Sequence, residues 1–140
     1  METPFEEYLR LWIAFAERDL SYARRMARSG MYDACAFFCE QAVEKMLKAR
    51  YLSRERRDAP RTHQIVKLAQ IVGLAGDLAE DLHDLERDYM QSRYPDMGWA
   101  RGELVYDASV AEERLAVAER VLAWLREQME EDDGDTDGSE

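Results

Sequence analysis

Four polar side chains recur along one predicted helix at spacings that place them on a single face. Gln41, Glu44, Lys45 and Lys48 stand at i, i+3, i+4 and i+7 of the run FFCEQAVEKMLKAR. The two lysines make this face a candidate for binding phosphate. The simpler interpretation is an exposed edge on which Glu44 and Lys48 form an i,i+4 ion pair, which contributes roughly 0.2–0.5 kcal/mol. Sequence alone favours this exposed edge, because such charges are rarely buried without partners.

A second candidate is Arg93, which ends another predicted helix in the stretch QSRYPDMGW (91–99). An arginine at this position can bind an anion, or it can satisfy carbonyls at the helix C-terminus and complement the helix dipole. Asp96 could pair with it. The sequence leaves the two roles of Arg93 open.

Other chemistry is sparse. Glu80 and His83 form one Glu-x-x-His, but a di-iron site needs a second copy, and the other histidine, His63, has no glutamate three residues before it. Cys35 and Cys39 lie one turn apart, yet a closed zinc site needs four ligands, so buried core thiols are the preferred interpretation. No glycine-rich phosphate loop or nucleophile elbow occurs. The sequence therefore predicts no catalytic residue, no metal and no cofactor.

Apolar residues spaced three and four apart predict the helices that must position these side chains. A first helix begins with the capping box Thr3-Pro4-Phe5-Glu6 and ends at Gly30. A second helix is expected over about 32–53, and a short third helix begins after Thr62. A fourth helix begins at about Leu78 and ends before Pro95. The last helix begins with a Ser109–Glu112 capping box. The predicted fold is all-α, an up-and-down four-helix bundle with one additional short helix.

Charge divides the chain into two parts. The 140 residues carry a net charge of −11, but the stretch EEDDGDTDGSE (130–140) holds seven acidic groups and no basic one, which leaves 23 acidic against 19 basic groups in residues 1–129. We therefore expect one bundle domain over 1–129 and a disordered acidic tail over 130–140. Because the net charge of residues 1–129 is close to zero, this part of the chain does not favour sequence-independent binding to duplex nucleic acid.

The location of the protein follows from what the sequence lacks. The start METPFEEY is acidic where a targeting segment would be basic, and no apolar run approaches the length of a membrane span. We expect a cytoplasmic protein with reduced thiols and no membrane partner.

Several stretches together resemble the HEPN family, small helical proteins often encoded beside minimal nucleotidyltransferases. The most specific features are the run Gln-x-x-Glu-Lys-x-x-Lys-Ala, a Thr-His pair and a Ser-Arg-Tyr-Pro corner, in this order. The matching stretches are AERDLSYARRMARSGMYDACAFFCEQAVEKMLKA (16–49), THQIVKL (62–68), SRYPD (92–96) and YDASVAEERLAVAERVL (106–122). The resemblance covers nearly the whole chain except the acidic tail.

The resemblance implies an up-and-down bundle, usually a homodimer, with a cleft near the subunit contact. It also implies one of two roles. Some HEPN proteins are metal-independent ribonucleases that act as toxins and are neutralised by a nucleotidyltransferase partner. Others bind a substrate or nucleotide for that partner.

The ribonucleases of the family carry an arginine, four to six intervening residues and then a histidine, near the position of Arg93. Here no histidine follows Arg93. We therefore predict a non-catalytic subunit that binds a nucleotide, an RNA or a nucleotidyltransferase partner. The candidate ligand-binding residues are Arg93, Lys45, Lys48, Glu44, Gln41, Tyr94, Asp96 and His63. In such a subunit, Tyr94 or Trp99 could stack on a nucleobase.

Two alternatives stay open. The first is a ribonuclease toxin with a degenerate motif, in which His63 or His83 supplies the proton transfer and an arginine stabilises phosphate charge. The second is a chain that only assembles, with the polar face of the second helix as its dimer contact.

Overall fold

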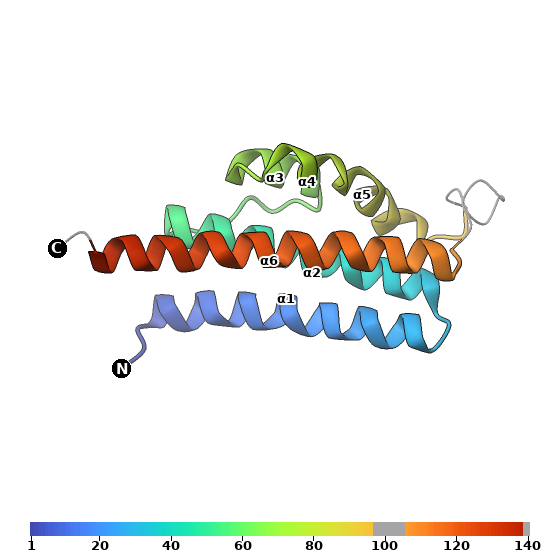
Figure 1. Ribbon diagram of the computed structural model, residues 1–140, viewed down its shortest axis with the longest axis horizontal. Helices are drawn as coiled ribbons and strands as arrows, with labels where there is room; N and C mark the ends of the chain where they lie inside the picture. The colour runs from blue at the N-terminus through green and yellow to red at the C-terminus, as the bar shows by residue number, and fades with distance from the viewer. Residues whose placement is uncertain (97–105, 139–140) are drawn as a thin grey trace.

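The computed structural model describes residues 1–96 and 106–138, with side chains described as far as residue 134. These residues form six α-helices and no strand (Figure 1). The helices are α1 (Pro4–Arg28), α2 (Tyr32–Glu55), α3 (Ile65–Val72), α4 (Gly76–Glu80), α5 (Leu82–Gln91) and α6 (Ala108–Gly138).

The three long helices α1, α2 and α6 lie side by side, and α2 and α6 both run in the direction opposite to α1 (Figure 1). Helices α3, α4 and α5 form a further layer over α2 and α6. Since α4 and α5 together take the place of the fourth long helix and α3 is the short extra one, the structure confirms the predicted all-α bundle.

Helix α2 lies at the centre and packs against α1, α6, α5 and α3. Its sequence is apolar on several flanks, as enclosure on several sides requires. Val43, Met46 and Leu47 are fully buried, and so are the free thiols of Cys35 and Cys39. The prediction of buried core thiols is therefore confirmed.

The helix ends agree with the sequence at some positions and not at others. At the start of α1 the Thr3 hydroxyl accepts from the Glu6 amide at 3.1 Å, and the Glu6 carboxylate accepts from the Thr3 amide at 3.0 Å, which confirms that capping box. At the start of α6 the predicted Ser109–Glu112 box is wrong. There the Asp107 carboxylate accepts from the Val110 amide at 2.9 Å, because an aspartate is an equally good cap.

The fourth predicted helix is two helices separated at Asp81. Leu78 before the break and Leu82 and Leu85 after it are all buried. Apolar spacing could not reveal this break, because the two pieces bury the same side of the chain.

Helix α6 continues past Met129 to Gly138, as far as the chain is described. Among the described side chains of this extension, Asp132 contacts Arg50 of α2, and residues 131–134 are exposed. The helix thus extends beyond the predicted domain, and the boundary after residue 129 stays a prediction.

Candidate functional site

The polar face of α2 is half buried rather than an exposed edge. Glu44 is only 6% exposed, and the side chains of Lys45 and Lys48 are 21% and 13% exposed. The reason is that α1 runs alongside this face, where Trp12 lines hollows together with each lysine. The preference of the sequence for a solvated edge was therefore wrong.

Each lysine of this face has a carboxylate partner. Lys45 pairs with the buried Asp19 of α1. The Lys48 ammonium lies 3.1 Å from Glu44 Oε2 as the expected i,i+4 pair. Because Asp19 lies on a neighbouring helix, the charge of Lys45 serves helix packing, and Lys48 is the lysine nearer to the rest of the candidate site.

Glu44 also joins α2 to the chain segment before α3. Its Oε1 lies 2.8 Å from Nδ1 of His63, whose side chain is 57% exposed. A carboxylate at one ring nitrogen orients the imidazole and leaves the other nitrogen to face a ligand. The structure thus brings together two residues that sequence analysis named on separate grounds.

Behind Glu44, one turn earlier on α2, lies a fully buried acid. Burial removes the Glu40 carboxyl from water and the charge of Glu44 lies close, so the pKa of Glu40 is raised to about 9. Its Oε2 accepts a hydrogen bond from the side-chain amide of Gln41 at 2.7 Å, while its Oε1 has no partner among the described residues.

The ring of Tyr89 on α5 is shared by two candidate residues. The imidazole of His63 stacks on it with a centroid distance of 4.6 Å and an interplanar angle of 17°. The guanidinium carbon of Arg93 lies 4.8 Å from the centre of the same ring. Phe37 of α2 extends the aromatic surface, with its ring 6.3 Å from that of Tyr89.

Arg93 is held by aromatic rings rather than by acids. Its guanidinium lies 5.9 Å from the Phe37 ring and 5.3 Å from the Tyr94 ring, and within the described part of the chain it forms no ion pair, with Asp96 or otherwise. Asp96 and Tyr94 are both exposed. Trp99, the other stacking candidate, lies outside the described residues.

A buried polar group fixes helix α5, which carries Tyr89 and is followed by Arg93. Asp88 accepts from Arg114 Nε of α6 at 2.6 Å and from the Tyr106 hydroxyl at 2.9 Å. Burial raises the pKa of Asp88, and the bonds from Arg114 and Tyr106 oppose this shift. This group was not predicted from the sequence, and only the unusual placement of Asp88 on the buried side of a helix could have indicated it.

Together these contacts form what we call the Tyr89 cluster, which consists of Tyr89, His63, Arg93, Glu44 and Lys48. It combines an imidazole oriented by a carboxylate with an arginine and a lysine. Such a set can bind phosphate, and the histidine can move a proton. Gln41 contacts Glu40 behind the cluster, and Lys45 is paired with α1.

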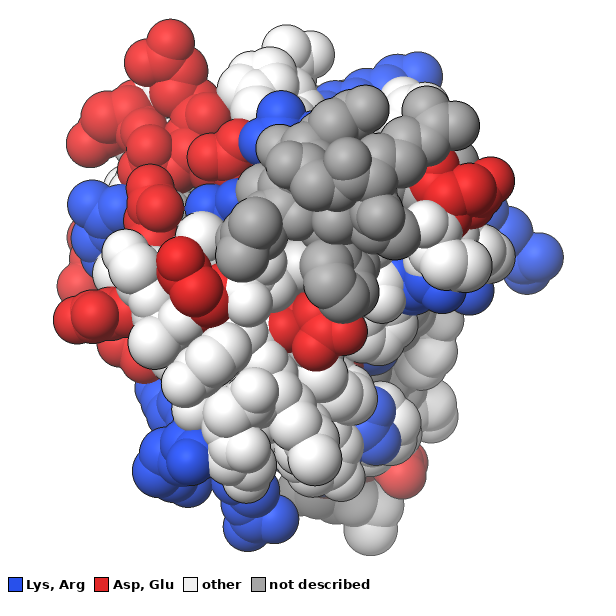
Figure 2. Space-filling model, turned by 90° about the vertical axis from the view of Figure 1, so that its right-hand side faces the viewer, with Lys and Arg blue, Asp and Glu red and all other residues white. Residues whose placement is uncertain are grey.

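Figure 2 shows the end of the bundle opposite the two chain termini, where the described residues form no continuous cationic surface. Acidic and basic groups lie next to each other at its edges, and uncharged surface occupies its lower centre. Sequence-independent duplex binding needs positive charge along the phosphate backbone, so this face does not suit it.

Comparison with known proteins identifies the family. The family model of the HEPN domain matches residues 9–128, which is nearly the whole bundle. The chain belongs to the HEPN family. The HEPN match ends one residue before Met129.

Two solved structures resemble this HEPN chain. One is TT1696 from Thermus thermophilus, with 31% identity over 85% of this chain and 96% of that chain, and a TM-score of 0.75. The other is ST0689, an archaeal HEPN homologue, with 30% identity over 86% of this chain and 97% of that chain, and a TM-score of 0.71. Among curated proteins none matches the chain.

The described residues contain no candidate metal site and no candidate membrane span. Within residues 1–96 and 106–138, no three histidine, cysteine or acidic side chains gather in a way that could hold a metal ion. In the same ranges every helix is too short or too polar to cross a membrane.

Proposed function

We propose that this HEPN chain binds a nucleotide through its phosphates and acts as a non-catalytic subunit for a nucleotidyltransferase. The observation that carries the proposal is the shared ring of Tyr89, which brings His63 and Arg93 to one place from opposite ends of the α3–α5 layer. Because the Arg93 guanidinium forms no ion pair with an acid among residues 1–96 and 106–138, it is available for bidentate contact with phosphate. Lys48 adds a further positive charge on the other side of Glu44.

The absence of a histidine after Arg93 supports a binding role over catalysis, because the family's ribonucleases use that residue. The partner is inferred from the resemblance to HEPN proteins encoded beside minimal nucleotidyltransferases. Co-purification with the nucleotidyltransferase encoded by an adjacent gene would support this part of the proposal. Failure of the two purified proteins to associate at micromolar concentration would contradict it.

Calorimetric titration of the purified chain with ATP tests the binding role. We expect a dissociation constant in the micromolar range, which corresponds to about −8 kcal/mol. Arg93→Gln should weaken binding at least tenfold, because it removes the charged phosphate contact. Arg87→Gln is the matched control, since Arg87 is an exposed arginine of the same α5 region that pairs with Asp84 away from the cluster. Absence of ATP binding at millimolar concentration would contradict the proposal.

A ribonuclease is the second candidate, and one observation favours it. The 2.8 Å contact between Glu44 and His63 is the arrangement by which a carboxylate prepares a histidine for general acid–base catalysis. Arg93 on the same aromatic surface could stabilise the phosphate charge. In this case purified protein would cleave cellular RNA and expression would arrest growth, with both effects lost in His63→Gln. Intact RNA and normal growth would exclude it.

We also propose that the chain forms a homodimer through α1. Tyr8, Leu11 and Phe15 are 42%, 41% and 45% exposed and recur at i, i+3 and i+7, which forms an apolar stripe on one face of the helix. A twofold contact needs such a self-complementary surface. The lysines of the polar face already have partners within the chain, so they are less suited to this contact.

A further inference from the structure

A small hollow lies beside the Tyr89 cluster, between the start of α1, the second half of α2 and the loop after α2. It has a volume of about 210 Å³, and its walls include Tyr8, Trp12, Lys48, Asp58 and Arg61. This volume is below the roughly 300–1,000 Å³ of pockets that enclose a whole drug-sized ligand. The hollow is thus suited to one part of a larger molecule.

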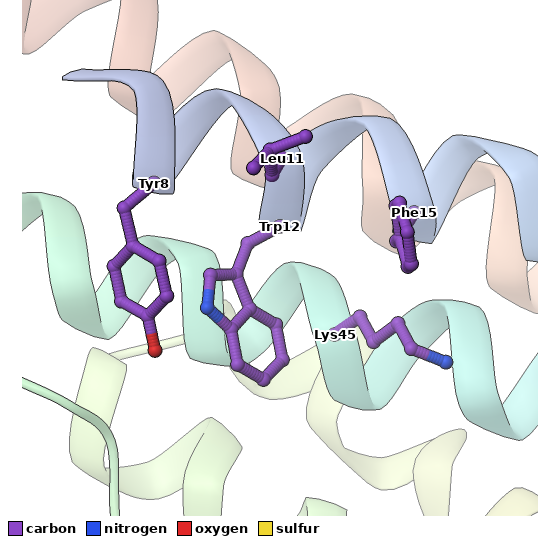
Figure 3. Close-up of a pocket in the computed structure, with 5 residues that line it drawn as sticks. All are labelled: Tyr8, Leu11, Trp12, Phe15 and Lys45. Carbon is purple, nitrogen blue, oxygen red and sulfur yellow. The ribbon is translucent and has the colours of Figure 1, made fainter. Parts of the chain in front are cut away.

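The walls of this hollow combine flat aromatic surface with positive charge. Figure 3 shows Tyr8 and Trp12 reaching from α1 over α2, and their rings stand edge to face at 88° with centroids 6.3 Å apart. The Tyr8 hydroxyl donates to Asp58 at 2.8 Å, which ties the loop to α1. A nucleobase can stack on such rings whatever its identity, and Lys48 and Arg61 supply the charge for an attached phosphate.

Lys48 connects the hollow to the Tyr89 cluster. Its ammonium lies 3.1 Å from one oxygen of Glu44, and the other oxygen of Glu44 lies 2.8 Å from His63. One carboxylate therefore separates the hollow from the imidazole, and Arg93 follows on the ring of Tyr89. A ligand bound along these residues would therefore have its flat part at Trp12 and its charged end at Arg93.

We propose that the ligand is a nucleoside triphosphate whose base lies in the hollow of Tyr8 and Trp12 and whose phosphates extend past Lys48 toward His63 and Arg93. This rests on the proposed nucleotide-binding function and adds the site and orientation of the base. It places the base on Trp12 and not on Tyr94. A neighbouring groove, lined by Leu11, Phe15 and Lys45 (Figure 3), shares Tyr8 and Trp12 with this hollow.

The test compares ATP with inorganic triphosphate, which has the charged end but no base. Calorimetric titrations use the full chain and the variants Trp12→Leu, Arg61→Gln and Arg93→Gln. We expect Arg93→Gln to weaken both ligands, and Trp12→Leu to weaken ATP roughly tenfold while triphosphate binding stays unchanged. Arg57→Gln is the matched control for Arg61→Gln, because both are exposed loop arginines and Arg57 contacts Tyr51 instead of the hollow.

Tryptophan fluorescence is a second measurement. Its main readout uses the unaltered protein, so it does not depend on a substitution that destabilises the fold. ATP should quench the emission of the unaltered protein, triphosphate should not, and the ATP effect should vanish in Trp12→Phe. Binding of both ligands with equal losses in every variant and no quenching at Trp12 would overturn the base site and leave phosphate binding intact. No binding of either ligand would overturn both proposals.

Discussion

His63 and Arg93 lie on the same ring, that of Tyr89, although one precedes α3 and the other follows α5. The ring therefore acts as a shared platform for an imidazole and a guanidinium. Residues that are far apart in sequence become one candidate site only because α3, α4 and α5 form a single layer over α2.

Replacement of Tyr89 tests this platform. Tyr89→Leu should lower ATP affinity several-fold, because both cationic side chains lose the surface that positions them. Tyr89→Phe should retain the affinity, since the ring and not the hydroxyl makes these contacts. Titration calorimetry measures both variants, with thermal unfolding as the check that each is folded. Equal affinity in Tyr89→Leu and the unaltered chain would show that the ring does not position the site.

The buried acid Glu40 predicts how stability depends on pH. Its pKa is raised from 4.5 to about 9 in the folded state, mainly by burial and next by the charge of Glu44. Between these values the folded state holds a proton that the unfolded state has released, so the free energy of unfolding falls as pH rises from 4.5 to 9. The fall is on the order of a few kcal/mol and levels off above pH 9.

Glu40→Gln separates this effect from other titrations. Glutamine keeps the shape of the protonated acid and cannot ionise, so the variant should unfold with a flatter pH dependence and gain stability relative to the unaltered protein at alkaline pH. Urea denaturation at pH values of about 5, 7 and 9, which span the titration window, measures the difference. A constant difference across this range would mean that Glu40 is already ionised at neutral pH.

The buried pair of Asp88 and Arg114 predicts a large stability effect. Removal of one partner leaves the other charge buried, so Arg114→Met should cost roughly 3–5 kcal/mol of unfolding free energy. The double variant Asp88→Asn, Arg114→Met should recover part of this cost, because no uncompensated charge remains. Arg120→Met is a suitable control, since Arg120 and its partner Asp81 are exposed. A loss below about 1 kcal/mol in Arg114→Met would indicate a solvated pair.

The apolar stripe of α1 predicts the oligomeric state. Phe15→Glu should convert the dimer to a monomer, because it places a charge within the apolar contact. Ile71→Glu is the control, since Ile71 of α3 is 44% exposed and Phe15 is 45% exposed. Light scattering after size-exclusion chromatography measures the mass. A monomeric unaltered chain, or a dimer that persists in Phe15→Glu, would contradict the α1 contact.

The sequence predicted the helices well because each buries a continuous stripe of apolar residues. The capping box at Thr3 and the left-handed Gly30 that follows α1 were visible as local signals. The break at Asp81 was not, since the apolar spacing continues across it. The cap at Asp107 was missed because two nearby residues could serve, and sequence does not decide between them.

The candidate site was predictable only in part. The polar face of α2 was found from spacing, but the burial of Glu44 depends on α1 and on the segment that carries His63, which spacing within one helix cannot report. Tyr89 was not among the candidate residues of the sequence, and its role is visible only from the stacking of the His63 ring on it. Contacts between distant segments are what a single sequence leaves undetermined.

The most direct test of the account is a double-mutant cycle on ATP affinity with His63→Gln and Arg93→Gln. If both residues contact the phosphates of one ligand through the shared platform, the two losses should differ from additivity by about 0.5–3 kcal/mol. The control cycle pairs Arg93→Gln with Arg87→Gln, which should be additive because Arg87 pairs with Asp84 away from the cluster. Additive losses for His63 and Arg93, or no loss in either variant, would contradict a single phosphate site on the ring of Tyr89.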